Sequence, residues 1–109
     1  MANLHRGEIS AELDGRQWTL CLTLGALAEL EAAYDGADLL QLAERFSKGR
    51  IAASDAIRIL GAGLRGAGHD VADADVARMR CEGGAAGLMR IVARLLNATF
   101  APADGAAGN

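Results

Sequence analysis

Apolar and polar residues alternate along the first part of the chain, a pattern typical of β-strands with one buried face. Two alternating runs lie on either side of Asp14-Gly15, a pair favoured in two-residue hairpin turns because both positions adopt positive φ. With this turn Ile9 faces Leu20, and the apolar residues of both strands share one face. We therefore predict a β-hairpin over residues 6–23. Its apolar face should pack on another element, because an isolated hairpin is only marginally stable.

Beyond the hairpin the hydrophobic period changes from two to about 3.6, which indicates helices over residues 24–100. Residues that favour helix starts and glycines that favour helix ends divide this stretch into four or five short helices. The expected N-caps are Thr23, Ser54 or Asp55, and Asp73 or Asp75, and the second helix should start near Asp38. The expected stops are Asp35-Gly36, Gly49, Gly66 with Gly68, and Gly83-Gly84. The last helix carries the longest apolar stripe and ends before Pro102.

These patterns predict an α+β fold, in which an N-terminal β-hairpin packs on a bundle of four to five short helices. A chain of 109 residues suits one compact domain, which we place at residues 1–100. Alanine and glycine together supply 38 of the 109 residues, so the core is thin. Residues 101–109 lack apolar periodicity, and we predict a disordered tail there.

The composition argues against several classes of protein. No apolar run approaches the roughly 18–20 residues that span a bilayer, and no signal peptide opens the chain. A net charge of −3 and a pI near 5.2 argue against nucleic-acid binding, which usually requires a basic patch. Two cysteines sixty residues apart form neither a disulfide framework nor a zinc ribbon. We therefore expect a cytoplasmic protein that binds neither membrane nor nucleic acid.

Residues 61–66 read G-x-G-x-x-G, the pattern found in dinucleotide-binding loops. This pattern binds a pyrophosphate only where a strand precedes it and a helix follows. Here Ile57, Leu60 and Leu64 precede or overlap the glycines at helical spacing. The glycines therefore favour close packing of a helix, and we reject a nucleotide-binding site.

The other polar residues that could take part in catalysis or hold a metal are isolated. His69-Asp70, with two aspartates nearby, fits a solvated loop with helix caps better than a metal site, since His5 is the only other histidine. Cys81 follows two arginines but has no candidate base at a recognisable offset. We expect no catalytic, metal-binding or cofactor-binding residues, and therefore no enzyme.

Four segments of the chain carry more information than its composition. They are Asn3–Glu8, Leu22–Glu31, Leu60–Gly66 and Glu82–Gly84. In order and spacing they resemble the small tail proteins of gene transfer agents, a family found in phage-like tail gene clusters of alphaproteobacteria, and the similarity extends over about residues 3–100. This family is labelled both as a tail tube component and as a tail assembly chaperone. The resemblance brings no catalytic or cofactor residues.

The chaperone label implies a helper that coats the tape-measure protein until the tail tube polymerises around it, and that works with other tail proteins. A tube subunit needs many alternating strands for a continuous inner β-layer, whereas this chain shows one hairpin followed by helices. We therefore predict a non-enzymatic tail assembly chaperone, with a structural tail tube subunit as the alternative. Self-association, a longer frameshifted product and association with the virion are left open.

A chaperone that binds an amphipathic helix needs an apolar surface. On the second helix Leu39, Leu42 and Phe46 share one side, and we expect this side to be the exposed patch. The stripe of the last helix should lie mostly in the core; it is formed by Leu88, Ile91, Val92 and Leu95. Trp18 could bind a partner or cover the apolar face of the hairpin, and the second interpretation is favoured. The candidate partner-binding residues are Leu39, Leu42, Phe46 and Trp18.

Overall fold

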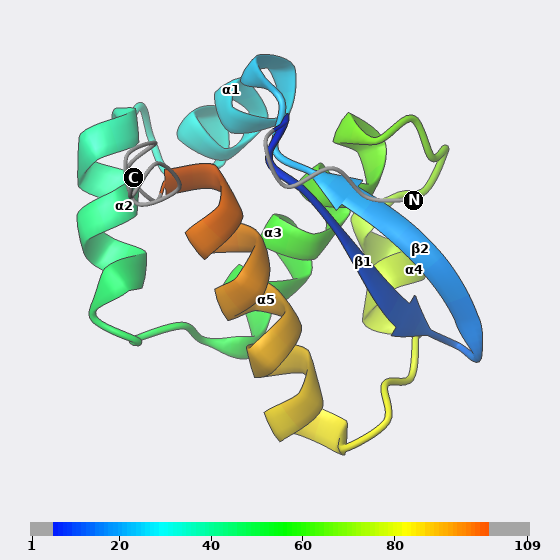
Figure 1. The fold of residues 1–109 in the computed structure, drawn as a ribbon. Coiled ribbons are helices and arrows are strands. Elements are labelled where there is room, and N and C mark those ends of the chain that lie inside the picture. Colours follow the sequence, from blue (N-terminus) through cyan, green and yellow to red (C-terminus); the bar gives the residue numbers. More distant parts are fainter. Residues whose placement is uncertain (1–5, 101–109) are drawn as a thin grey trace, which may run out of the picture.

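An antiparallel β-hairpin and five helices make up residues 6–100, the part of the chain that the computed structural model describes (Figure 1). The elements are β1 (Glu8–Leu13), β2 (Arg16–Cys21), α1 (Leu24–Ala33), α2 (Leu39–Ser47), α3 (Ala53–Gly66), α4 (Asp73–Ala77) and α5 (Gly84–Phe100). This arrangement confirms the predicted α+β fold. The tail predicted at 101–109 and the stop at Pro102 lie outside the described residues. No helix within residues 6–100 is long and apolar enough to cross a membrane.

The hairpin has the register that its turn requires. Ile9 pairs with Leu20 and Leu13 pairs with Arg16, and the turn between them is formed by Asp14-Gly15. Both turn residues have positive φ, 55° and 74°, as a two-residue turn of this kind demands. The alternation and the turn sequence therefore predicted the pairing of the strands correctly.

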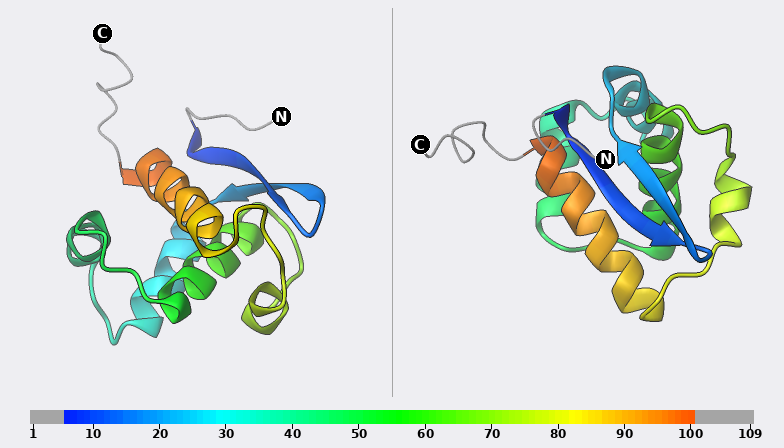
Figure 2. Two further views of the ribbon diagram at one scale, coloured as in Figure 1. Left: turned by 90° about the horizontal axis from the view of Figure 1, so that it is seen from below. Right: turned by 45° about the vertical axis from the view of Figure 1, so that its right-hand side comes forward.

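The apolar face of the hairpin packs on two helices, which form a second layer of the molecule (Figure 2). α3 lies against β2, α5 lies against β1, and the two helices contact each other. α1 and α4 pack on α3, whereas α2 contacts α1 and α5 at the side of the molecule (Figure 1). The most deeply buried large side chains are Ile9, Leu13, Leu20, Leu42, Ile59, Leu60, Leu64, Val92 and Leu95.

The first helix begins at its predicted cap, Thr23, and the second begins at Asp38, near which its start was predicted. The Thr23 hydroxyl accepts a hydrogen bond from the Ala26 N–H at 3.1 Å. At the start of α2 the Asp38 carboxylate accepts from the Gln41 N–H at 2.8 Å, and the Gln41 side chain accepts from the Asp38 N–H at 2.9 Å. This reciprocal pair is a capping box, which satisfies two N–H groups that lack a partner within the helix.

α3 and α4 begin earlier than predicted, because their acidic residues occupy the third helical position and not the N-cap. The N-caps are Ala52 and Ala72. The Asp55 carboxylate accepts from the Ala52 N–H at 2.8 Å, and the Asp75 carboxylate accepts from the Ala72 N–H at 2.9 Å. An acid at this position also lies where the helix dipole favours negative charge.

The helix ends follow the glycines except at α4. The first three helices end at or just before the predicted stops, and Gly36, Gly49 and Gly68 have positive φ. α4 ends at residue 77 and not at Gly83-Gly84. The segment between them cannot continue as a helix because it is bonded to the hairpin turn: the Arg80 N–H donates to the Asp14 carboxylate at 2.9 Å, and the Asp14 N–H donates to the Arg80 carbonyl at 2.8 Å.

The glycines of the G-x-G-x-x-G pattern lie inside α3, where they permit close contacts with three other elements. A Cβ atom would overlap Asp73 of α4 at Gly61, Leu95 of α5 at Gly63, and the Cys21 carbonyl group of β2 at Gly66. The residues before the pattern are helical, so the strand that a dinucleotide-binding loop requires is not there. The predicted packing role is confirmed.

Candidate functional site

The apolar side of α2 faces the interior of the molecule, which corrects the prediction of an exposed patch there. Leu42 and Phe46 are only 1% and 4% exposed. The Phe46 ring meets the Tyr34 ring edge-on, with centroids 5.8 Å apart. Leu42 and Phe46 both lie in the core. The helices are rich in Ala and Gly, so these larger side chains are needed to fill the interior to the usual packing density. Leu39 is 36% exposed, and a role of these residues in binding a partner stays a prediction.

Trp18 is half-buried on the hairpin, where contacts within the chain hold its indole ring. Its Nε1–H donates to the Leu13 carbonyl oxygen at 3.0 Å. The ring meets the His69 ring edge-on at 4.9 Å between centroids, and the Arg16 guanidinium carbon lies 4.4 Å from its centroid. The indole therefore covers the apolar face of the hairpin, the interpretation favoured from the sequence. Partner binding by Trp18 stays a prediction.

An open apolar groove of about 560 Å³ runs between α2 and α5, which stand next to each other in Figure 1. The α5 wall presents Met89, Ala93, Leu96 and Phe100, spaced at roughly one helical turn. The opposite wall is formed chiefly by Ala43 and Phe46 of α2 and by Ile51 of the following loop. Sequence reasoning did not separate the α5 wall from the stripe in the core, because it assigned all the apolar residues of this helix to a single stripe. The second stripe is visible in the sequence as the unusual width of the apolar face.

The apolar surface of the groove continues along the exposed side of α2. Leu40 is 74% exposed, and it lies three residues before Ala43 and seven before Ser47, both of which line the groove. Residues at these spacings share one side of a helix. Leu40 therefore extends the groove toward the start of α2, and Leu39 lies beside it.

The two segments of the chain that form the groove are basic although the whole chain is acidic. Residues 39–54 and 84–100 together contain five basic side chains and one acidic side chain, Glu44. The other described residues contain six basic and twelve acidic side chains. Lys48 and Arg50 lie on either side of Gly49, which lines the groove, and Arg90 follows Met89. None of these three cations forms an ion pair with another described residue.

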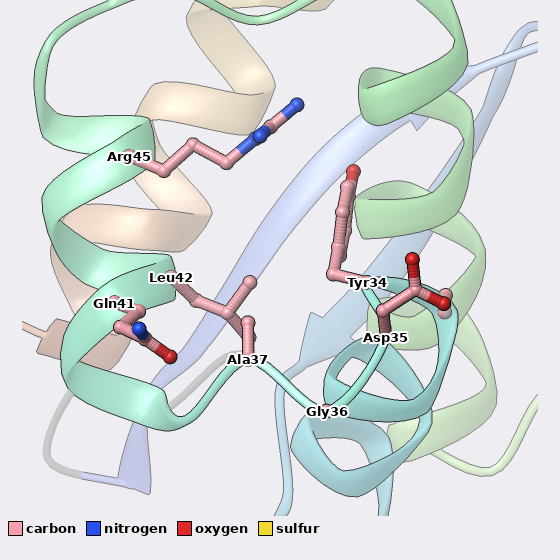
Figure 3. A pocket seen from close by; sticks show the side chains of 8 residues that line it. Tyr34, Asp35, Gly36, Ala37, Gln41, Leu42 and Arg45 are labelled. Carbon is pink, nitrogen blue, oxygen red and sulfur yellow. The ribbon is translucent and has the colours of Figure 1, made fainter.

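A second hollow, of about 650 Å³, lies where α1 turns into α2 (Figure 3). Tyr34 and Arg45 line it from opposite sides. The Tyr34 hydroxyl donates a hydrogen bond to the Asp55 carboxylate, and the Arg45 guanidinium lies 3.8 Å from the same carboxylate. The guanidinium carbons of Arg45 and Arg58 lie 5.1 Å and 5.4 Å from the centre of the Tyr34 ring. These contacts connect the C-terminal end of α1 with α2 and α3 and stabilise their packing.

The electrostatics of this junction favour a structural role. Burial works to raise the pKa of Asp55, but hydrogen bonds from the Tyr34 hydroxyl and the Ala52 N–H, together with the charge of Arg45, hold the pKa below its ordinary value of 3.8. Burial and the bond to Asp55 raise the pKa of Tyr34 above 10.0. Both pKa values move away from neutrality, which is unfavourable for proton transfer near pH 7.

The remaining candidate residues for chemistry contact other parts of the chain. Within residues 6–100, no group of three or more His, Cys, Asp or Glu side chains is placed to hold a metal ion. The His69 ring packs on Trp18, and its Nε2 atom is buried without a hydrogen-bond partner among the described residues. Burial raises the pKa of the Cys21 thiol. The Cys81 thiol donates to the Glu82 carbonyl oxygen at 3.3 Å.

Comparison with known proteins identifies the family. A protein-family model described as phage tail tube protein, GTA-gp10, matches residues 6–102. The chain belongs to this family. The GTA-gp10 match spans the hairpin and the five helices described above, and it confirms the resemblance to gene transfer agent tail proteins. No curated protein and no solved structure shows significant similarity to the chain.

Membership in the GTA-gp10 family makes this chain a phage tail-related protein that acts together with other tail proteins. The description of the family names a tail tube protein. Membership does not separate a tube subunit from an assembly chaperone, because both labels refer to the same family. The β structure and the surfaces of residues 6–100 are the features that bear on this distinction.

Proposed function

We propose that this GTA-gp10 family member is a non-enzymatic tail assembly chaperone, which binds the tape-measure protein while the tail is built. The observation that carries the proposal is the small amount of β structure. Residues 6–100 contain two strands of six residues each, whereas a tube wall needs subunits that contribute strands to a continuous β-layer. Five helices follow the hairpin in the described chain, which suits the binding of another helix in a groove.

The outer edge of the hairpin supports the same proposal. In the register observed, the Ser10 carbonyl oxygen points away from β2, toward the open edge of β1. The Arg94 side chain donates a hydrogen bond to this oxygen at 2.9 Å. An edge acceptor that is already bonded is less available to pair with a strand of a neighbouring subunit. Extension of the sheet across the β1 edge, from one copy to the next, is therefore disfavoured.

A structural tail subunit is the second candidate, because the family description itself names a tube protein. Mass spectrometry of purified particles separates the two functions. A chaperone is expected to be absent from mature particles, or present far below the amount of the major tail proteins. Stoichiometric amounts of this chain in mature tails would overturn the chaperone proposal and favour the tube subunit.

The proposed partner is tested by co-expression with the tape-measure protein encoded in the same tail gene cluster. We expect tagged full-length chain to retain the tape-measure protein in a pull-down and to keep it soluble. A tape-measure protein that is not retained would contradict the proposed function. We propose that the complex forms in the cytoplasm, before the tail is assembled.

A further inference from the structure

The groove between α2 and α5 has the dimensions of a site for a short helix. Its α5 wall runs from Met89 to Phe100, eleven residue steps that rise about 16 Å along the helix axis. A helix of three turns has this length and places side chains at i, i+4 and i+7 along one side. Exposed Leu40 extends the apolar surface on the α2 side of the groove.

The charges beside the groove specify the partner further. The segments that form the groove carry five basic side chains against one acidic side chain. Two of the five have partners elsewhere, since Arg45 lies beside Asp55 and Arg94 donates to the Ser10 carbonyl oxygen. The other three, Lys48, Arg50 and Arg90, form no ion pair with the described residues. Unpaired cations beside an apolar floor complement a surface that is apolar in the middle and acidic at its margin. Nucleic acid fits less well, because phosphates would have to lie along an apolar floor.

A second copy of this chain offers a poor occupant for the groove. Among the described residues, the large apolar side chains with high exposure are Leu24, Leu39 and Leu40. Leu39 and Leu40 already belong to the groove region. A neighbouring copy that presented a different surface would therefore supply Leu24 alone, and a single leucine does not form the stripe of anchors that a helix in a groove uses. A symmetric contact of groove with groove would bring the basic segments of both copies together, and like charges across an interface oppose binding.

We infer that this groove binds an amphipathic helix of another protein, in which acidic residues flank an apolar stripe. The inference rests on the proposed function, since it names the surface and the chemistry by which the chaperone holds its partner. The apolar stripe of the partner contacts Met89, Ala93 and Phe100, and its carboxylates lie near Lys48 and Arg50. The core residue Leu42 stays buried and takes no part in the contact.

The apolar part of the inference is tested with Ala93→Glu in the full chain, co-expressed with the tape-measure protein. Ala93 is exposed and lines the groove, so a carboxylate there leaves the fold intact but places a charge on the apolar floor. Ala28→Glu, at an exposed position of α1, is the matched control. We expect Ala93→Glu to reduce retention of the tape-measure protein about tenfold or more, and Ala28→Glu to leave it unchanged. Ser47→Glu on the opposite wall should act like Ala93→Glu, so the test does not depend on one variant.

The results distinguish the two levels of the proposal. Retention by the wild type and equally by Ala93→Glu and Ser47→Glu would overturn the groove and leave the chaperone function standing. Lack of retention by the wild type would overturn both. A change in the oligomeric state of the isolated chain on Ala93→Glu, without loss of retention, would assign the groove to a second copy and overturn the inference.

The acidic character of the partner is tested by charge reversal. Arg50→Glu changes an exposed cation beside the groove, and Arg80→Glu changes an exposed cation between α4 and α5. Neither arginine forms an ion pair within residues 6–100. We expect Arg50→Glu to weaken binding of the tape-measure protein about threefold to tenfold and Arg80→Glu to have less effect. Equal losses for both variants, or tighter binding by Arg50→Glu, would overturn this part. Binding of DNA by the wild type that is lost in Arg50→Glu would indicate nucleic acid as the occupant.

Discussion

The Asp55 carboxylate accepts hydrogen bonds from the Tyr34 hydroxyl and the Ala52 N–H, while the Arg45 guanidinium lies nearby. Asp55 is 4% exposed, and a buried carboxylate is tolerated only where its oxygens have partners. One side chain therefore joins the end of α1, the middle of α2 and the first turn of α3. The wall of the groove formed by α2 depends on this junction for its position.

Asp55→Asn is expected to destabilise the fold. The amide replaces one accepting oxygen by a donor, so either Tyr34 or Ala52 loses its acceptor. We expect the free energy of unfolding to fall by about 2 kcal/mol and the thermal midpoint, measured by circular dichroism, to fall by about 10 °C. Asp35→Asn, in the exposed turn after α1, is the control and should change the free energy by less than about 0.5 kcal/mol. Equal midpoints for the two variants would contradict this account.

The same carboxylate should make stability depend on pH in the acidic range. The pKa of Asp55 is lower in the folded protein than its ordinary value of 3.8, so the unfolded chain takes up the proton first as the pH falls. The stabilisation is present above the unfolded pKa and is lost as the pH falls through the folded pKa. The thermal midpoints of wild type and Asp55→Asn should therefore converge between about pH 5 and pH 2. A difference that stays constant over this range is the contrary result.

At the scale of the elements, α3 lies so close to the hairpin that the backbones of the two elements are in direct contact, with no side chain between them at Gly66. Gly66 leaves no room for a Cβ atom beside the Cys21 carbonyl group. Backbone cannot move aside as the end of a flexible side chain can. The short distance between α3 and β2 is therefore fixed by glycine, and this contact positions the hairpin on the helices.

Gly66→Ala is expected to destabilise the protein although alanine favours helices. The added methyl group must displace β2, at a cost of about 1–3 kcal/mol. Gly25→Ala in α1 is the control, since the nearest atom to its added Cβ is 3.9 Å away, and it should stabilise by up to about 1 kcal/mol. Chemical denaturation of both variants measures the two changes. A stabilised Gly66→Ala variant would show that α3 and β2 are less closely packed than described.

The elements differ in how far the sequence alone predicts them. The hairpin register follows from Asp14-Gly15 and the alternation on either side, which are local features. The caps at Thr23 and Asp38 are local as well. Ala52 and Ala72 were not predicted as N-caps because the signal lies in the acid three residues later. The end of α4 depends on hydrogen bonds to Asp14, more than sixty residues earlier in the chain, and no local pattern indicates such a contact.

At the scale of the whole molecule, the groove arises from two helices about forty residues apart in the sequence. Periodicity shows that each helix has an apolar side but not which element covers it. Phe46 was expected on the surface because α2 has a strong apolar side and the core is poor in large residues. Because large residues are few, the apolar side of α2 is instead buried in the core. The second stripe of α5 is left only partly covered and forms the groove.

The uneven charge of the molecule has a consequence for the speed of complex formation. The segments that form the groove carry an excess of positive charge, and the rest of the described chain carries an excess of negative charge. An electric dipole of this kind turns the molecule as an acidic partner approaches, so that more collisions occur at the correct face. Stopped-flow measurements at increasing salt should show a falling association rate constant and a nearly constant dissociation rate constant. The charges then act before contact is made, and the apolar floor determines how long the complex lasts.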